Sequence, residues 1–414
     1  MRSFSIQTFG CRANQAEAFL WADELQNLGL MYEKDPVQSD LILVNTCTVT
    51  RNADRDVRKF IRNLIRLHPK AGIVVTGCYV QRSPEEFKGI PQVCGIYTNE
   101  EKEGLIREIL PCVRPRLLVP ILPYRSRALV KIQDGCNFRC TFCIVPKVRG
   151  KSRSMEKERV LALIRKYIDQ GFQEVGLTGI HLCSYGLDLK PKTSLLELLE
   201  EIEQLDGLGH LRLSSLDPRF LNLPLLRHIT KSEKICPHFH LSLQNGSERI
   251  LRRMGRRTKI EEYKNILDDL RRHSPQASIG ADIIVGFPGE SEEDFERTYS
   301  FLESSPLTYF HVFSYSPRPS TEAASWHQME GRVKKERAAL LRSLGQRKNL
   351  GFRQQFAGKT CEAIVIKKEK ECTQVLTSNY LKVNIASCPS DIKEKVRVKI
   401  TRVSMEETRG HIIP

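Results

Sequence analysis

The chain has 414 residues, 40% hydrophobic and 28% charged, a composition that excludes disordered, collagen-like and membrane-bundle proteins. Its 65 Lys and Arg exceed its 49 Asp and Glu, and the net charge of +16 favours a polyanionic partner such as a nucleic acid. No apolar run is long enough to span a membrane, and the first residues lack an apolar export segment, so we expect a cytoplasmic protein without a membrane partner. Thirteen cysteines are many for such a chain, and we expect metal ligation or thiol chemistry from some of them.

Buried strands alternate with amphipathic helices through residues 1–110. This alternation predicts a parallel sheet with helices on its faces. The predicted strands are 4–9, 40–45 and 72–76, and the predicted helices are 14–28, 54–67 and 99–110. A proline-rich stretch follows and is typical of a domain boundary; its prolines are Pro111, Pro115, Pro120 and Pro123.

A second alternation begins near residue 127 and predicts six strands. These are 128–133, 173–178, 210–215, 238–243, 278–285 and 309–314, with helices at 157–167, 194–205, 260–272 and 291–303 between them. The pattern predicts a barrel or partial barrel of the β/α type. An open doubly wound sheet would give the same alternation, so periodicity alone leaves both folds open.

The last part of the chain is basic and rich in short strands. From Glu330 onward 19 Lys and Arg face 9 Asp and Glu, which places +10 of the total +16 in this segment. A basic helix is predicted over 333–355. The short strands after it, 362–366, 373–376, 381–385 and 396–403, have the spacing of a small antiparallel barrel.

Three cysteines lie close together in the loop after the strand 128–133, with the spacing C-x3-C-x2-C. They are Cys136, Cys140 and Cys143, and their thiolates can converge on one iron–sulfur cluster while leaving one iron open. Zinc is the alternative metal, but structural zinc usually takes four ligands, and no second cysteine pair lies nearby. The remaining interpretation, three buried cysteines acting as small apolar side chains, fits poorly with a polar, glycine-flanked loop.

Three more cysteines each follow a predicted strand of the first sheet. They are Cys11, Cys47 and Cys78. Because the carboxyl ends of parallel strands lie at one edge of a sheet, we expect the three thiols to meet there in a second site. A buried core cysteine is the alternative for any one of them. The other seven show no such pattern and are assigned to packing: Cys94, Cys112, Cys183, Cys236, Cys361, Cys372 and Cys388.

The cysteine loop and several later motifs, taken in order, resemble the radical S-adenosylmethionine (SAM) methylthiotransferase family. The matching stretches are 135–146, Arg149-Gly150, Arg153-Ser154, 177–179, 214–218, 240–247, 282–290 and 311–319, together with the N-terminal cysteines. Two positions depart from the family pattern. Cys183 stands where relatives usually carry a small residue, and Asp217 stands where Glu is expected.

The resemblance implies an α/β chain of three domains. These are an N-terminal methylthiotransferase domain (1–112), a radical SAM partial barrel (122–348) and a small antiparallel barrel of the TRAM type that binds RNA (349–414). It also implies SAM and two [4Fe–4S] clusters, one on Cys136, Cys140 and Cys143 and one on Cys11, Cys47 and Cys78. The electron donor would be a flavodoxin or a ferredoxin.

Two stretches, 45–55 and 240–244, resemble the enzymes that act on N6-threonylcarbamoyladenosine at position 37 of tRNA. The expected reaction is insertion of a methylthio group at C2 of that adenine. Alternative substrates are isopentenyladenosine at position 37 and an aspartate of a ribosomal protein. A protein of another class, an electron carrier or a non-catalytic iron–sulfur RNA-binding protein, is the remaining alternative.

Residues near the strand ends of the central barrel are expected to bind the cofactor. The candidates are Phe138, Glu174, Thr178, Ser215, Asp217, Gln244 and Val285. Basic residues of the last helix and barrel are expected to contact tRNA phosphates, and one tyrosine could stack on a base. These candidates are Lys334, Lys335, Arg337, Arg347, Lys348, Tyr380 and Lys382.

Overall fold

A computed structural model describes residues 2–110, 126–369, 372–386 and 390–413. The chain forms two compact units: Met1–Arg125 with Asp134–Ser152 and Ser316–Thr321, and Ser126–Gln133 with Arg153–Tyr315 and Glu322–Pro414. The four prolines of the expected boundary, with Cys112 and Cys388, lie outside the described residues. The division into three domains therefore stays a prediction. Within the described ranges, no helix is long and apolar enough to cross a membrane.

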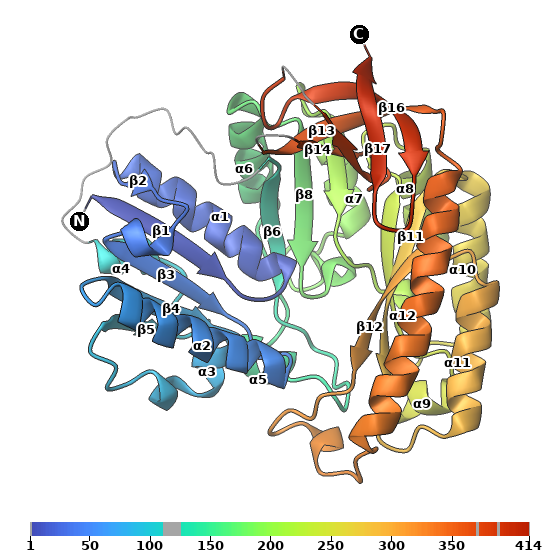
Figure 1. Cartoon of the computed structure of the whole chain (residues 1–414), viewed down its shortest axis with the longest axis horizontal. Helices are drawn as coiled ribbons and strands as arrows, with labels where there is room; N and C mark the ends of the chain where they lie inside the picture. The colour runs from blue at the N-terminus through green and yellow to red at the C-terminus, as the bar shows by residue number, and fades with distance from the viewer. Residues whose placement is uncertain (1, 111–125, 370–371, 387–389, 414) are drawn as a thin grey trace. The chain divides into compact units, whose positions relative to one another are not determined.

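A five-stranded parallel sheet forms the centre of the first unit, in the order β2-β1-β3-β4-β5 (Figure 1). Its strands are β1 (Ser3–Thr8), β2 (Met31–Tyr32), β3 (Leu41–Thr46), β4 (Gly72–Gly77) and β5 (Val93–Tyr97). Every residue of β3 is buried, as expected for a central strand covered on both faces. The predicted parallel sheet is thus confirmed, and β2 and β5 are edge strands that the sequence pattern did not indicate.

Helices cover both faces of this sheet (Figure 1). Apolar residues of α1 and α4 pack on one face and those of α2 and α3 on the other. The helices of the unit are α1 (Arg12–Asn27), α2 (Arg51–Leu67), α3 (Cys78–Arg82), α4 (Leu105–Ile109) and α5 (Val145–Arg149). Helix α2 begins where the Thr50 hydroxyl accepts a hydrogen bond from the Ala53 amide. The helix predicted over 99–110 is wrong in length, because only its last turns are helical.

Six parallel strands follow one another in chain order in the second unit. They are β6 (Ala128–Asp134), β8 (Glu174–Gly179), β9 (His210–Leu213), β10 (His238–Gln244), β11 (Ser278–Val285) and β12 (Tyr309–Ser314); β7 (Arg153–Ser154) adds an edge to β6. Hydrogen-bonded ladders join β6, β8 and β9 into one sheet and β10, β11 and β12 into another. Two isolated bridges connect the sheets: Leu211 of β9 pairs with Ile235, and Leu216 pairs with Leu241 of β10. A sequential order is that of a barrel, whereas a doubly wound sheet reverses direction, so the partial barrel is confirmed.

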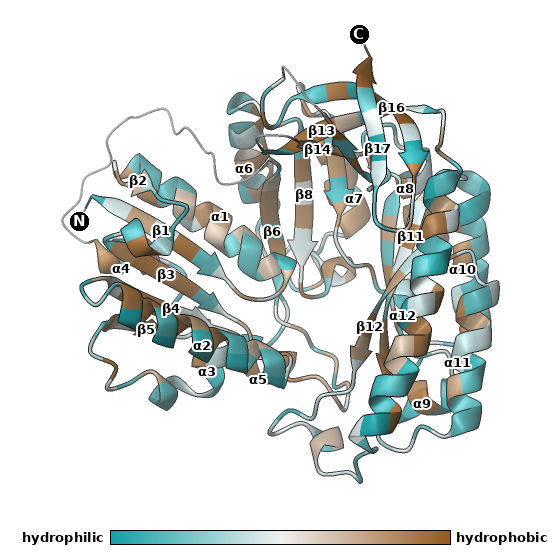
Figure 2. Ribbon diagram, viewed as in Figure 1, coloured by the Kyte–Doolittle hydropathy of each residue, from teal (hydrophilic) through white to brown (hydrophobic). Residues whose placement is uncertain are grey.

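Helices lie between these strands in the chain, and α12 follows the last strand and contacts β11 and β12. They are α6 (Lys157–Asp169), α7 (Leu195–Glu203), α8 (Leu223–Lys231), α9 (Glu248–Arg253), α10 (Ile260–His273), α11 (Glu292–Ser304) and α12 (Gly331–Gln354). Helix α11 begins with a capping box between Ser291 and Asp294. Figure 2 shows hydrophobic strands and hydrophilic outer surfaces on α10 and α12.

A closed five-stranded barrel forms the last part of the second unit (Figure 1). Its strands are β13 (Thr360–Lys368), β14 (Thr373–Thr377), β15 (Lys382–Ile385), β16 (Lys395–Val403) and β17 (Thr408–Ile413). Four pairs are antiparallel and one, β15 with β17, is parallel. The predicted small barrel is confirmed. Strand β17, which closes it, was missed because its sequence mixes Gly, Arg and His with isoleucine.

Candidate active site

Cys11, Cys47 and Cys78 lie at the carboxyl ends of β1, β3 and β4. Cys47 and Cys78 directly follow their strands, and Cys11 precedes α1 as its N-cap residue. The three strands are neighbours in the sheet, so the three cysteines share one edge. Cys47 and Cys78 are buried and Cys11 is exposed, and none of the three is in a disulfide. One edge thus holds three reduced thiols, a donor set that suits a metal cluster.

Gly10 is what allows the Cys11 loop to pass close to Cys47. Its φ of +118° lies in the region that only glycine adopts readily. A Cβ at this position would lie 2.7 Å from the Cβ of Cys47 and 2.9 Å from its sulfur. Any larger residue would therefore push the two cysteines apart.

Burial opposes ionisation of the Cys47 thiol at this edge. It raises the pKa of Cys47 to about 12, and the neighbouring Cys11 and Cys78 add to that effect. Because a cysteine binds metal as the thiolate, binding here requires the metal itself to displace the proton. The site is therefore suited to a tightly held cluster rather than to a reactive free cysteine.

The second cysteine set lies on an irregular loop between β6 and α5. The Cys136 amide donates to the carbonyl of Gly150 at 3.1 Å, and the Cys143 amide donates to that of Cys140 at 3.0 Å. Cys136, Cys140 and Cys143 are all partly exposed, unlike a core cysteine. Gly135, at φ +69°, begins the loop, and a Cβ there would lie 2.0 Å from the Lys151 carbonyl oxygen. The loop is thus a tightly closed turn that presents three thiols.

A buried polar network joins this loop to the N-terminal sheet within the first compact unit. Arg149 Nη1 lies 3.0 Å from Glu17 Oε1 and 2.8 Å from Asp134 Oδ1, and Nη2 donates to the Asn14 side chain. Lys102 also pairs with Glu17, at 2.6 Å. Burial disfavours the charge of Arg149, but Glu17, Cys78 and Asp134 together hold its pKa well above the ordinary value. A fixed positive charge therefore lies beside thiols that would be anionic when they bind metal.

Cys78 also packs directly against the cluster loop. It forms an apolar cluster with Ile144 and Val148. The Asn99 side chain donates to the Val148 carbonyl at 2.6 Å and to the Cys78 sulfur at 3.6 Å. The two cysteine sets, far apart in sequence, are therefore held by one set of contacts.

The candidate cofactor residues of the barrel occupy different ends of their strands. Thr178, Gln244 and Val285 lie at the carboxyl ends of β8, β10 and β11, and Ser215 follows β9. Gln244 has φ +81°, an unusual value for a residue other than glycine. Phe138, partly buried, lies in the cluster loop of the first unit.

Glu174 lies at the opposite end, as the first residue of β8. Burial alone would raise its pKa, but Arg212 and Arg127 lower it to about 2. The Arg212 Nε lies 2.7 Å from the carboxylate, and Nη1 donates to the Ser378 carbonyl before β15. This contact links the base of the partial barrel to the C-terminal barrel, so its position favours a structural role over cofactor binding.

The two departures from the family pattern contact each other. The Asp217 amide donates to the sulfur of Cys183 at 3.3 Å. The carboxylate of Asp217 is surrounded by His181 at 3.2 Å, Arg219 at 2.6 Å and Arg256 at 3.5 Å. Although burial opposes it, these partners hold the Asp217 pKa below its usual range. Sequence reasoning missed His181 and Arg256, because only the folded chain brings them to Asp217, and it missed Arg219 although this residue is two positions away.

The basic candidates differ in exposure. Lys335 and Arg347 on α12, and Lys382 on β15, are exposed. Lys348 donates to the carbonyls of Glu303 and Ser305, and Lys334 lies over the Tyr315 ring.

Arg337 and Tyr380 are engaged by their own chain. Arg337 is buried between Glu290 and Glu292, at 2.7 and 2.8 Å. The Tyr380 ring stacks on His238 with 4.1 Å between centroids. These internal contacts favour the exposed side chains as RNA contacts.

Comparisons with known proteins identify the family. Residues 130–302 match the Radical SAM superfamily, and residues 3–98 match Uncharacterized protein family UPF0004. The protein of Aquifex aeolicus called threonylcarbamoyladenosine tRNA methylthiotransferase MtaB is 38% identical over 92% of this chain and 95% of its own length. The protein of the same name from Bacillus subtilis is 33% identical over 100% of this chain and 97% of its own. The chain belongs to the radical SAM methylthiotransferase family.

Members of this family are enzymes that use SAM and a [4Fe–4S] cluster. A further relative, from Moorella thermoacetica, is called tRNA-2-methylthio-N(6)-dimethylallyladenosine synthase and is 33% identical over 100% of this chain and 98% of its own. Among solved structures, the radical SAM methyltransferase TsrM of Kitasatospora setae superposes with a TM-score of 0.56, at 16% identity, over 78% of this chain and 75% of its own. That likeness concerns the fold alone.

Proposed function

We propose that this methylthiotransferase inserts a methylthio group at C2 of N6-threonylcarbamoyladenosine at position 37 of tRNA, in the cytoplasm. The names of its relatives from Aquifex aeolicus and Bacillus subtilis support this substrate. The stretches 45–55 and 240–244, which resemble enzymes acting on that nucleoside, support it independently.

The observation that carries the proposal is the joint placement of the two cysteine sets in one compact unit. One set lies at the carboxyl edge of the parallel sheet and the other on the loop before α5. Arg149, Asn99 and Cys78 connect them through the contacts described above. A metal-stabilised RNA-binding module would need only one such set.

The chemistry explains why a radical cofactor is needed. C2 of an adenine is unactivated, and acid–base side chains cannot make it reactive. Cys136, Cys140 and Cys143 would hold the cluster that, with SAM, supplies radical chemistry, and Cys11, Cys47 and Cys78 would hold a second [4Fe–4S] cluster that carries the sulfur.

The chain's own residues would place the charges and the cofactor. Arg149 keeps a positive charge beside the thiolates, and Gly10 and Gly135 keep the two loops closed. Thr178, Ser215 and Gln244 are the polar groups at strand ends that would orient SAM.

Exposed basic side chains would bind the tRNA backbone. Lys335, Arg347 and Lys382 are suited to this role because they are exposed, and of these Arg347 also donates to the Tyr299 hydroxyl at 3.1 Å. Such contacts fix the position of an RNA without reading its sequence. The closed barrel β13–β17 would act as the TRAM-like module, and a flavodoxin or ferredoxin would deliver electrons.

A second candidate is methylthiolation of isopentenyladenosine at the same tRNA position. The whole-length similarity to the Moorella thermoacetica synthase favours it over a ribosomal-protein substrate. This reaction would use the same six cysteines, so only the modified nucleoside distinguishes the two candidate functions.

Nucleoside mass spectrometry of tRNA tests the proposal. A bacterial strain lacking its own methylthiotransferases receives this chain, or the Cys47→Ala or Cys140→Ala variant. We expect 2-methylthio-threonylcarbamoyladenosine only with the unchanged chain, whereas cells with either variant keep the unmodified nucleoside. Methylthiolation of isopentenyladenosine instead would establish the second candidate and contradict the first.

A further inference from the structure

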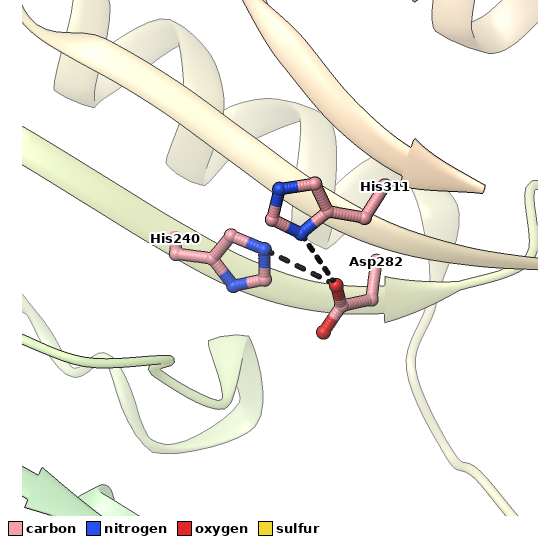
Figure 3. Close-up of side chains that lie close together, drawn as sticks. All are labelled: His240, Asp282 and His311. Carbon is pink, nitrogen blue, oxygen red and sulfur yellow. Dashed lines mark hydrogen bonds and ion pairs between the residues drawn. The ribbon is translucent and has the colours of Figure 1, made fainter. Parts of the chain in front are cut away.

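Two histidines and an aspartate come together on the inner face of the partial barrel. In the sequence, all three follow the last cysteine of the two sets. His240 is on β10, Asp282 on β11 and His311 on β12 (Figure 3). In the parallel pairing of β11 with β12, Asp282 lies opposite His311. In the pairing of β10 with β11, His240 lies opposite Gly280. Successive residues of a strand point to opposite faces, so Leu241, Ile283 and their neighbours face the helices while these three face inward.

The three side chains offer one ligand atom each within a small volume. All three atoms lie within 4.8 Å of one another. His240 Nε2 is 3.4 Å and His311 Nδ1 is 3.2 Å from the same oxygen, Asp282 Oδ1 (Figure 3). A tetrahedral ion with bonds of about 2.0–2.1 Å to nitrogen and oxygen has ligand atoms about 3.3 Å apart. Both nitrogen–oxygen separations lie close to that edge length.

The state of His240 gives a second, independent indication of a ligand. The residue is only 9% exposed. Its Nδ1 is hydrogen-bonded to the Ser215 hydroxyl at 3.1 Å. Its buried Nε2 makes no hydrogen bond of good geometry within the described residues and has only the Asp282 carboxylate, at 3.4 Å, as an ion-pair partner. A metal-binding histidine typically uses one nitrogen for the ion and holds the other by a hydrogen bond from outside, and His240 shows this arrangement.

The charge and exposure of the other two residues fit the same role. An aspartate carboxylate is ionised at neutral pH, so Asp282 supplies an anionic oxygen close to both imidazoles. His311 is 58% exposed at its side chain, which leaves the outer side of the cluster open to a further ligand.

We propose that His240, Asp282 and His311 bind one divalent transition-metal ion, zinc or iron(II), with Ser215 orienting His240. Two imidazoles and one carboxylate are the ligand set of catalytic zinc sites and of mononuclear iron(II) sites, and three protein ligands leave at least one position open. That position takes an oxygen ligand such as water, a hydroxyl or a carboxylate. The site uses none of the six cysteines of the two sets, and it does not depend on the proposed tRNA substrate.

Zinc K-edge X-ray absorption on the cluster-loaded chain tests the proposal, because it detects zinc without interference from iron. The chain is reconstituted anaerobically, treated with a chelator, given one equivalent of zinc sulfate and passed over a desalting column. We expect about one retained zinc with nitrogen and oxygen scatterers, imidazole rings among them, and no zinc–sulfur shell at about 2.3 Å.

Variants locate the ion. Asp282→Asn and His311→Ala should each weaken zinc binding at least tenfold in a competition titration with a coloured chelator, and Ser215→Ala should weaken it about tenfold. His273→Ala, which removes an exposed histidine on α10, is the matched control and should bind as the unchanged chain does. Circular dichroism spectra verify that the variants fold.

Three outcomes would overturn the proposal. They are failure of the loaded chain to retain zinc, a zinc–sulfur shell, and equal affinity in Asp282→Asn and His273→Ala. None of these readouts involves tRNA. A negative result for the metal site can therefore be told apart from a negative result in the nucleoside experiment.

Discussion

Arg149 and Glu17 form an ion pair of 3.0 Å across 132 positions of the sequence, with side chains only 1% and 5% exposed. Arg149 ends the helix that follows the C-x3-C-x2-C loop, and Glu17 lies on the helix that follows Cys11. This pair therefore ties the two cysteine sets to each other. Removing one partner of a buried pair leaves an uncompensated charge, which is costly.

Arg149→Gln should destabilise the first unit by roughly 3–5 kcal/mol, because Glu17 would keep Lys102 but lose Arg149, and Asp134 would lose Arg149 as well. Urea denaturation of the cluster-free chain, followed by circular dichroism, measures this loss. Arg62→Gln, which removes an exposed arginine of α2, is the control and should unfold within about 0.5 kcal/mol of the unchanged chain. Equal unfolding midpoints for the two variants would show that the pair contributes nothing.

Gly10→Ala should disrupt the site formed by Cys11, Cys47 and Cys78, because the new Cβ would clash with Cys47. Gly89→Ala is a matched control: its φ of +77° gives comparable backbone strain, roughly 1–3 kcal/mol, but no atom lies within 4 Å of the added Cβ. Iron analysis after anaerobic reconstitution should show about half the iron in Gly10→Ala and full iron in Gly89→Ala. Full iron in both would refute the steric argument.

Glu174 should make the stability of the second unit sensitive to acid. Its pKa of about 2 lies below the ordinary 4.5, so its contribution is present above pH 4.5 and is lost as the pH falls toward 2. The shift corresponds to roughly 3 kcal/mol. Denaturation between pH 6 and pH 3 should show a steeper loss for the unchanged chain and the exposed-site control Glu261→Gln than for Glu174→Gln. If the free energy of unfolding fell equally with pH in all three proteins, Glu174 would not be the source of the acid sensitivity.

Lys335→Gln and Lys382→Gln should each lower the affinity for tRNA and reduce the slope of log affinity against log salt by about 1, as expected for a lost phosphate contact. Filter binding at several potassium chloride concentrations measures the slope. Lys264→Gln, on the exposed face of α10, should leave it unchanged. If all three variants keep the original slope, the barrel and α12 do not hold the RNA backbone.

Local pattern was enough to place the elements that form the site. Three cysteines after three strands predicted a shared sheet edge, because parallel strands fix where their ends lie. The same pattern placed the six strands of the partial barrel within a few residues of their observed bounds.

Partners distant in sequence were beyond such reasoning. Nothing near Arg149 or Glu17 indicates that they meet. The sequence pattern identifies the strand of Glu174 but not the arginines, Arg127 and Arg212, that engage its carboxylate. Likewise, a basic pattern on α12 did not reveal that Arg337 turns inward to Glu290. His240 and Asp282 were visible only as parts of family motifs, and their convergence with His311 depends on strand register.

The most direct test of the account is iron quantification with Mössbauer spectroscopy on two triple variants reconstituted anaerobically. One replaces Cys11, Cys47 and Cys78 by Ala, and the other replaces Cys136, Cys140 and Cys143. The account predicts two [4Fe–4S] clusters, about eight irons, in the unchanged chain and one cluster in each variant. It also predicts that only the variant with Cys136, Cys140 and Cys143 intact cleaves SAM. Two clusters in either variant, or SAM cleavage without that trio, would contradict it.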